Sequence, residues 1–163
     1  MDEIRYCEGV HTDSHYFHAV IDRIEELIIS KPMGGQGYLQ FLNLGLYQQA
    51  LILCEKTIME NPMDPDAYFY AAVSMLSGKR PFLLDRATIQ KIEEYLSIAV
   101  TIRNDAVYHY FLAYIKLDYY YRKMLRAVPD YRTELQKALE LSITAEEVTA
   151  LFKLLRTSRP AEL

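Results

Sequence analysis

The sequence predicts an all-α fold, and three observations carry that prediction. Apolar residues recur at spacings of three and four along most of the chain, as on the buried face of a helix. No segment alternates apolar and polar residues in the manner of a strand. Only 6 glycines and 6 prolines occur in 163 residues, too few for the many turns of an all-β domain. A chain of this length is expected to form a single domain, residues 1–163.

The first predicted helix covers residues 13–30. Asp13 is expected to cap it, because an aspartate carboxylate accepts the unpaired N–H groups of a first turn. An apolar stripe at helical spacing begins at Phe17 and ends at Ile28. Pro32 and the stretch MGGQG then interrupt the pattern, so a connection between helices is expected there.

The second helical region begins at about Tyr38 or at Leu46 and ends at Asn61, because Pro62 cannot continue a helix. The inner face of its clearest part, ALILCEKTIMEN, is predicted at Ala50, Leu51, Cys54 and Ile58.

The next helix lies in DPDAYFYAAVSMLSG, residues 64–78. Asp64 or Asp66 is placed to cap it, and Pro65 suits its first turn. A loop, GKRPFLLDR, follows this helix.

Four more helices are predicted in the rest of the chain, which makes about seven in all. Their segments are ATIQKIEEYLSIAVTIRN, the aromatic run AVYHYFLAYIKLDYYYRKML, YRTELQKALEL and TAEEVTALFKLLR. The apolar positions of the first segment are Ile89, Ile92, Leu96 and Ala99. In the last segment Thr144 and Glu147 match a capping box, in which each side chain accepts a bond from the main-chain N–H of the other.

Residues 45–75 resemble the tetratricopeptide repeat, a helix–turn–helix unit of about 34 residues. The matching positions are Gly45, Tyr47, Gln48, Ala50, Cys54 and Pro62, followed by Tyr68, Ala71, Ala72 and Met75 in the next unit. A weaker third copy is formed by Ile92, Leu96 and Ala99 and then by Leu112 and Ala113. The resemblance covers about residues 38–117. It implies a short array of helical hairpins, a small α-solenoid, capped by residues 13–30 and 132–156 because single repeats cannot bury their own faces.

Proteins of this family use the first helices of successive units to line a concave groove for an extended peptide or a partner's helix. Carried over residue by residue, the resemblance implies a groove formed by Phe69, Val73, Leu76, Tyr110, Tyr114 and Leu117. Tyrosine and phenylalanine suit this role, because they offer a large contact area at low entropic cost. The alternative is that these aromatic side chains pack against the C-terminal helices, which would fill the groove. The sequence alone leaves both interpretations open.

A second candidate surface surrounds the three consecutive tyrosines at 119–121. On a helix, consecutive side chains point about 100° apart, so at least one of the three is expected to be exposed. Tyr120, Arg122 and Lys123, with Arg126 nearby, predict a mixed aromatic and basic patch for a protein partner.

The charge distribution bears on the class of partner. The net charge of −4 disfavours nucleic acid, because phosphate contacts need clustered lysine and arginine. Residues 1–64 carry 4 basic and 10 acidic side chains, whereas residues 79–137 carry 11 basic and 7 acidic ones. This asymmetry leaves open a homo-oligomeric structural protein, in which the acidic and basic regions of neighbouring copies meet. Two unlike solvated faces are the simpler interpretation.

No catalytic residue, metal site or cofactor is predicted. The GGQ at 34–36 is the tripeptide that peptide-release factors use for hydrolysis, but three residues are a weak signal and a flexible connector is favoured. His11, His15 and His18 suggest a metal site or a small hydrolase, yet the stripe from His15 to Glu25 lies opposite the apolar face of its helix. A solvated face is therefore favoured. The expected function is a non-catalytic adaptor that binds another protein or peptide.

A cytoplasmic location is expected. The first ten residues, MDEIRYCEGV, lack the basic and apolar regions of a signal peptide. No apolar run approaches the roughly 20 residues that span a bilayer, so no membrane partner is predicted. Cys7 and Cys54 show no paired or metal-ligand spacing, which suits a reducing compartment.

Overall fold

A computed structural model describes residues 36–163, within the compact unit Gly35–Leu163. This part of the chain holds seven α-helices, and none of its residues is in a strand, so it is all-α. The predicted helix at 13–30, with its cap Asp13, lies outside the described residues. The prediction of one domain over 1–163 includes that helix and stays a prediction.

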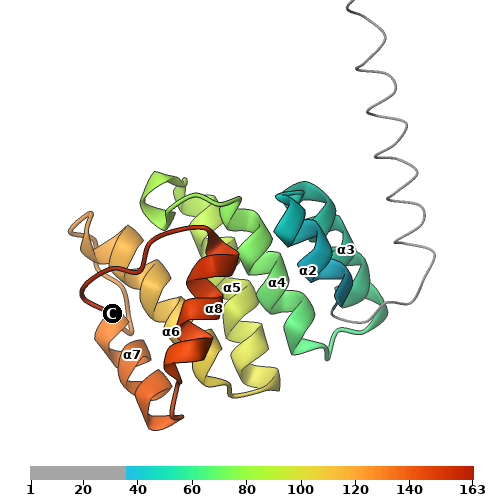
Figure 1. The fold of residues 1–163 in the computed structure, drawn as a ribbon. Coiled ribbons are helices and arrows are strands. Elements are labelled where there is room, and N and C mark those ends of the chain that lie inside the picture. The colour runs from blue at the N-terminus through green and yellow to red at the C-terminus, as the bar shows by residue number, and fades with distance from the viewer. Residues whose placement is uncertain (1–35) are drawn as a thin grey trace, which may run out of the picture. The chain divides into compact units, whose positions relative to one another are not determined.

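The helices follow one another with short connections. They are α2 (Gln36–Leu44), α3 (Tyr47–Glu60), α4 (Pro65–Leu76), α5 (Arg86–Ile102), α6 (Ala106–Ile115), α7 (Tyr131–Glu140) and α8 (Ala145–Leu155). A 3-10 helix, Pro81–Leu83, lies in the loop after α4, and a π-helix, Lys116–Tyr121, continues α6. Each helix from α2 to α6 packs against its successor, and α8 returns to pack on α6 and α4 (Figure 1).

The predicted helix starts are confirmed where the signal is local. Asp64 caps α4, and its Oδ1 accepts a hydrogen bond from the N–H of Asp66 at 3.0 Å. Pro65 occupies the first turn. Thr144 and Glu147 form the expected capping box of α8: the Glu147 N–H donates to Thr144 Oγ1 at 3.2 Å, and the Thr144 N–H donates to Glu147 Oε2 at 2.8 Å. These bonds satisfy N–H groups that the helix itself leaves unpaired.

Of the two predicted starts of the second helical region, the one at Leu46 agrees with α3, which begins at Tyr47. Helix α2 precedes it as a separate helix, because Gly45 adopts a left-handed φ of 76° between α2 and α3. One boundary differs from the prediction. The aromatic run stops being α-helical after Ile115 and leaves the π-helix at Tyr121, short of the predicted Leu125. Met124 has a φ of 57°, which a right-handed helix does not accommodate.

Small residues bring the helices of the core close together. The fully buried ones include Ala50, Cys54, Ala71, Ala72, Ala99 and Ala113. Ala50 and Cys54 were predicted on the inner face of α3 and are confirmed there, whereas Leu51 and Ile58 are only partly buried. All four apolar positions predicted for α5, Ile89 to Ala99, are fully buried. Burial raises the pKa of the Cys54 thiol.

Candidate functional site

The six predicted groove positions are buried. Phe69, Val73 and Leu76 belong to α4, Tyr110 and Tyr114 to α6, and Leu117 to the π-helix. None of them exposes more than 7% of its surface.

Helix α8 accounts for the burial of Tyr110 and Tyr114. Their rings meet Phe152 of α8 edge-on, with centroids 6.3 and 5.1 Å away. The Tyr114 hydroxyl donates to Thr157 Oγ1 at 3.2 Å, and the Tyr110 hydroxyl donates to the Leu163 main-chain oxygen at 3.2 Å. These two tyrosines therefore pack against a C-terminal helix, which was one of the two interpretations of the sequence. In the described part of the chain, α8 occupies the surface of α6 on which these two tyrosines lie.

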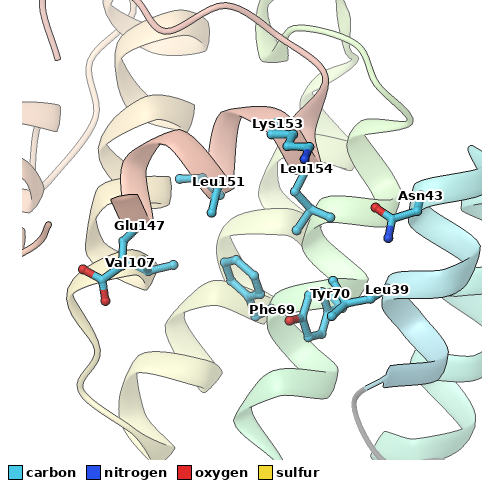
Figure 2. Close-up of a pocket in the computed structure, with 10 residues that line it drawn as sticks. Leu39, Asn43, Phe69, Tyr70, Val107, Glu147, Leu151, Lys153 and Leu154 are labelled. Atoms are coloured by element: carbon cyan, nitrogen blue, oxygen red, sulfur yellow. The ribbon is translucent and has the colours of Figure 1, made fainter. Parts of the chain in front are cut away.

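A cleft lies beside α8, where this helix does not pack closely against α2 and α4. It has a volume of about 330 Å³ and lies between α8 on one side and α2 and α4 on the other (Figure 2). Leu151 and Leu154 of α8 point toward Phe69 and Tyr70 of α4 and toward Leu39 of α2. Among the predicted groove residues, Phe69 alone lines this cleft. The cleft can therefore accept an apolar group between two walls of leucine and aromatic side chains.

Polar side chains stand at the two ends of the cleft. Glu147 and Lys153 lie six positions apart on α8, which is about 9 Å along the helix axis. The capping box holds the Glu147 carboxylate in place. Lys153 makes no ion pair with any residue in the described range. Because the charges at the two ends are opposite, a ligand that carries a positive and a negative group would be favoured in one orientation in the cleft.

Arg156 fixes the spacing between α8 and α2. It ends α8 in the left-handed conformation, and its Nη2 donates to the main-chain oxygens of Leu42 at 3.3 Å and Asn43 at 2.7 Å. These oxygens belong to the last turn of α2, where a cation is favoured, and the Leu42 oxygen also accepts from the Gly45 N–H at 3.0 Å. The contact joins residues more than 110 positions apart. For that reason no local sequence signal pointed to Arg156.

The tyrosines at 119–121 divide as predicted. Tyr119 is buried, Tyr120 is partly buried, and Tyr121 exposes 51% of its surface. The Tyr120 hydroxyl donates to Glu93 Oε2 at 2.6 Å. That contact and burial raise its pKa, with burial as the larger cause.

The other two predicted patch residues also make contacts within the chain. Arg122 pairs with Glu162 at 3.3 Å and with the buried Asp118 at 3.5 Å. Lys123 Nζ lies 3.9 Å from the centre of the Tyr119 ring. Arg122 and Arg126 are exposed with Tyr121, and the exposed apolar side chains of Met124, Leu125 and Val128 lie beside them, so this surface is mixed in character.

Sequence reasoning also missed a buried polar cluster between α6 and α7. His109 Nδ1 lies 2.8 Å from Glu134 Oε2, and His109 Nε2 lies 2.8 Å from Asn104 Oδ1. Lys116 Nζ donates to Glu134 Oε1 at 3.1 Å. A histidine beside a carboxylate is the arrangement of a general base, but both ring nitrogens are occupied here and no hydroxyl or thiol of the described residues bonds to the ring. The cluster therefore joins two helices.

Within residues 36–163, no group of three or more histidine, cysteine, aspartate or glutamate side chains is placed to hold a metal ion. No helix in that same range is long and apolar enough to cross a membrane. The histidine stripe, Cys7 and the two glycines of GGQ lie outside the described residues. The Gln of that tripeptide, Gln36, is the first residue of α2.

No protein-family model, curated protein or solved structure matches this chain.

Proposed function

We propose that this chain is a non-catalytic adaptor that holds a short segment of a partner protein in the cleft between α8 and helices α2 and α4. The observation that carries the proposal is the cleft itself: an open, mostly apolar hollow walled by helices, with a charged residue at each end. Interfaces of this kind draw most of their binding energy from one apolar or aromatic anchor in a pocket.

The dimensions of the cleft suit a peptide. The rise of about 9 Å along α8 from Glu147 to Lys153 corresponds to about three residues of an extended chain, which rises by about 3.3 Å per residue. One large apolar side chain of such a segment would lie between Leu151, Leu154 and Tyr70. Burial raises the pKa of Tyr70, so its hydroxyl stays protonated at neutral pH and can donate to a main-chain oxygen of the ligand.

We also propose that the helices form a degenerate tetratricopeptide-like array, with α7 and α8 as its C-terminal cap. Two observations support it: each helix from α2 to α6 packs against the next, and the small residues Ala50 and Ala72 of the repeat signature are fully buried. The cytoplasm is the proposed location, supported by the reduced, buried thiol of Cys54.

Peptide selection tests the cleft directly. A random-peptide library would be selected on the full chain, and the enriched peptides measured against the Ala150→Arg variant. Ala150 lines the cleft and is exposed, so an arginine there fills the hollow without disturbing the core. Thr149→Arg is the matched control, since Thr149 is the exposed neighbour on the same helix and does not line the cleft.

The proposal predicts enriched peptides that share a large apolar residue and that lose at least about tenfold in affinity for Ala150→Arg but not for Thr149→Arg. Peptides that bind both variants as well as the parent chain would place the binding site elsewhere. A library that yields no shared motif would contradict peptide binding.

Self-assembly is a second candidate function, favoured by the exposed apolar side chains after the π-helix. Met124 exposes 96% of its surface and Val128 88%. Sedimentation over a range of concentrations would show a rising mass, which Met124→Asp lowers if this surface is the contact. A mass that instead falls as salt rises would assign the contact to the acidic and basic regions.

A further inference from the structure

A basic hollow lies where the loop after α4, the end of the π-helix and the segment after α8 meet. Its volume is about 560 Å³. Five basic side chains line it: Lys79, Arg80, Arg122, Arg156 and Arg159. Thr157 and Ser158 line it as well and add two hydroxyl groups. A chain with a net charge of −4 therefore gathers five cations around one small concavity.

The carboxylates near the hollow neutralise only part of this charge. The buried Asp118 accepts from Arg80 Nη2 at 2.5 Å and lies 3.5 Å from Arg122 Nε. Glu162 lies 3.3 Å from Arg122 Nη2. In the described part of the chain, no carboxylate side chain pairs with Lys79, Arg156 or Arg159. Arg159 Nη2 donates instead to the Leu163 main-chain oxygen, and Arg156 Nη2 donates to main-chain oxygens of α2. Among the described residues, these two arginines and Lys79 therefore have no acidic side chain as a partner.

The arginines also have hydrogen-bond donors that they do not use within the described residues. A guanidinium carries five N–H groups. The bonds of Arg80, Arg156 and Arg159 within the described residues all leave from Nη2, so the Nε and Nη1 groups of these side chains are not used in them. A fork of such donors matches the oxygens of phosphate better than a single carboxylate, because phosphate offers three acceptor oxygens and up to two negative charges.

We propose that this hollow binds a phosphate group. The proposal goes beyond the peptide cleft and does not depend on it, although the two sites adjoin: Arg156 lines the hollow, and its Nη2 donates to the main-chain oxygen of Asn43, which lines the cleft. The phosphate comes either from a phosphorylated side chain of a protein or from a free phosphate or pyrophosphate ion. The recognising chemistry is the same for both sources.

Titration of the full chain with inorganic phosphate, pyrophosphate and an Ala/Gly peptide that carries one phosphoserine tests this proposal. Affinity would be measured by calorimetry, and the site located by the NMR signals of the arginine Nε–H groups. The test variant is Lys79→Glu/Arg159→Glu, which avoids the two arginines that contact the buried Asp118. The control is Lys56→Glu/Lys91→Glu, an equal change of net charge at exposed lysines of α3 and α5.

We expect the arginine signals of the hollow to shift with phosphate or pyrophosphate. The affinity should fall at least about tenfold in the test variant and change less than about twofold in the control. Tighter binding of the phosphoserine peptide than of free phosphate, with none for its unphosphorylated form, would identify a phosphorylated protein as the source. Equal or weaker binding of that peptide would support the site and identify a free anion as its ligand.

Three outcomes would overturn the proposal: no binding of any phosphate probe, an equal loss of affinity in both variants, or measurable binding of the phosphoserine peptide that its unphosphorylated form equals. Circular dichroism checks that both variants fold. If the test variant unfolds, the NMR map of the parent chain decides: shifts confined to arginines outside the hollow would refute the site.

Discussion

Phe152 of α8 packs edge-on against Tyr114 of α6, with ring centroids 5.1 Å apart and ring planes at 75°. This geometry is the favoured one for aromatic pairs, because the positive edge of one ring meets the negative face of the other. Through this contact, α8 packs on the surface of α6 where the family resemblance predicted a ligand groove. Tyr110 and Tyr114 of α6 therefore pack in the core under α8, and the cleft of about 330 Å³ lies beside this contact.

Phe152→Ala should lower the free energy of unfolding by about 3 kcal/mol or more, because it removes a buried ring and leaves a cavity. Urea unfolding followed by circular dichroism measures this. Phe82→Ala is the control, since Phe82 exposes 41% of its surface and should cost about 1 kcal/mol or less. Equal losses in the two variants would mean that α8 does not depend on its aromatic contact.

Arg156→Met should loosen α2 specifically. The variant keeps the length of the side chain and removes the donors to the oxygens of Leu42 and Asn43. Hydrogen bonds from a charged group contribute about 1.5 to 3 kcal/mol, so amide exchange in α2 should accelerate by at least about tenfold. Lys153→Met, on the same end of α8, should leave the exchange rates unchanged. Uniform acceleration in all helices would show a global rather than a local effect.

Glu134 should make the fold sensitive to acid. Burial alone would raise the pKa of Glu134, but the hydrogen bond from His109 and the charge of Lys116 together outweigh it, and the pKa lies below its ordinary value. A carboxylate with a lowered folded-state pKa adds stability above its unfolded pKa of about 4.5, and that contribution disappears as the pH falls through the folded value.

The Glu134→Gln variant isolates this contribution. It should cost about 3 kcal/mol at pH 7, because it leaves Lys116 buried without a charged partner. The gap to the parent chain should narrow below about pH 4.5, where the parent loses the same charge. Urea titrations from pH 7 to pH 3 measure both. A gap that stays constant over this range would contradict the pKa assignment.

Gly78→Ala should destabilise the turn after α4. Gly78 has a φ of 69°, which a residue with a Cβ adopts at a cost of about 1 kcal/mol, and a Cβ there would lie 2.7 Å from the Tyr47 hydroxyl oxygen. Thermal unfolding of Gly78→Ala and of Tyr47→Phe/Gly78→Ala separates the two causes. The double variant should recover the steric part and keep the backbone part. No recovery would assign the whole cost to the backbone.

The features that the sequence predicted well are local ones. The cap at Asp64, the capping box at Thr144 and Glu147, and the buried stripe of α5 each depend on residues within a few turns of one another. Helix propensity and capping act over that range, so these features can be predicted from the sequence without knowledge of the tertiary structure. At least one of the three tyrosines at 119–121 was expected to be exposed, and Tyr121 is, although this segment is a π-helix and not the α-helix on which the expectation was based.

The features that it did not predict require distant partners. The packing of α8 on α6 brings Tyr114 into contact with Phe152. The hydrogen bond from Arg156 to Asn43 of α2 joins residues from nearly opposite ends of the described chain. The sequence left open whether Tyr110 and Tyr114 line a binding groove or pack against the C-terminal helices, because spacing carries no information on what covers them. The cleft exists because α8 covers one part of that surface and not another.

The buried thiol of Cys54 gives this protein a chemical reporter of its own motion. Its side chain is fully buried on α3, which packs against α2 and α4, and burial raises its pKa, so the reactive thiolate is scarce while the helices stay together. A thiol reagent can reach it only when α3 separates from its neighbours. In a chain with Cys7 replaced by serine, the rate of labelling would therefore time the opening of the helices beside the cleft, with no added probe.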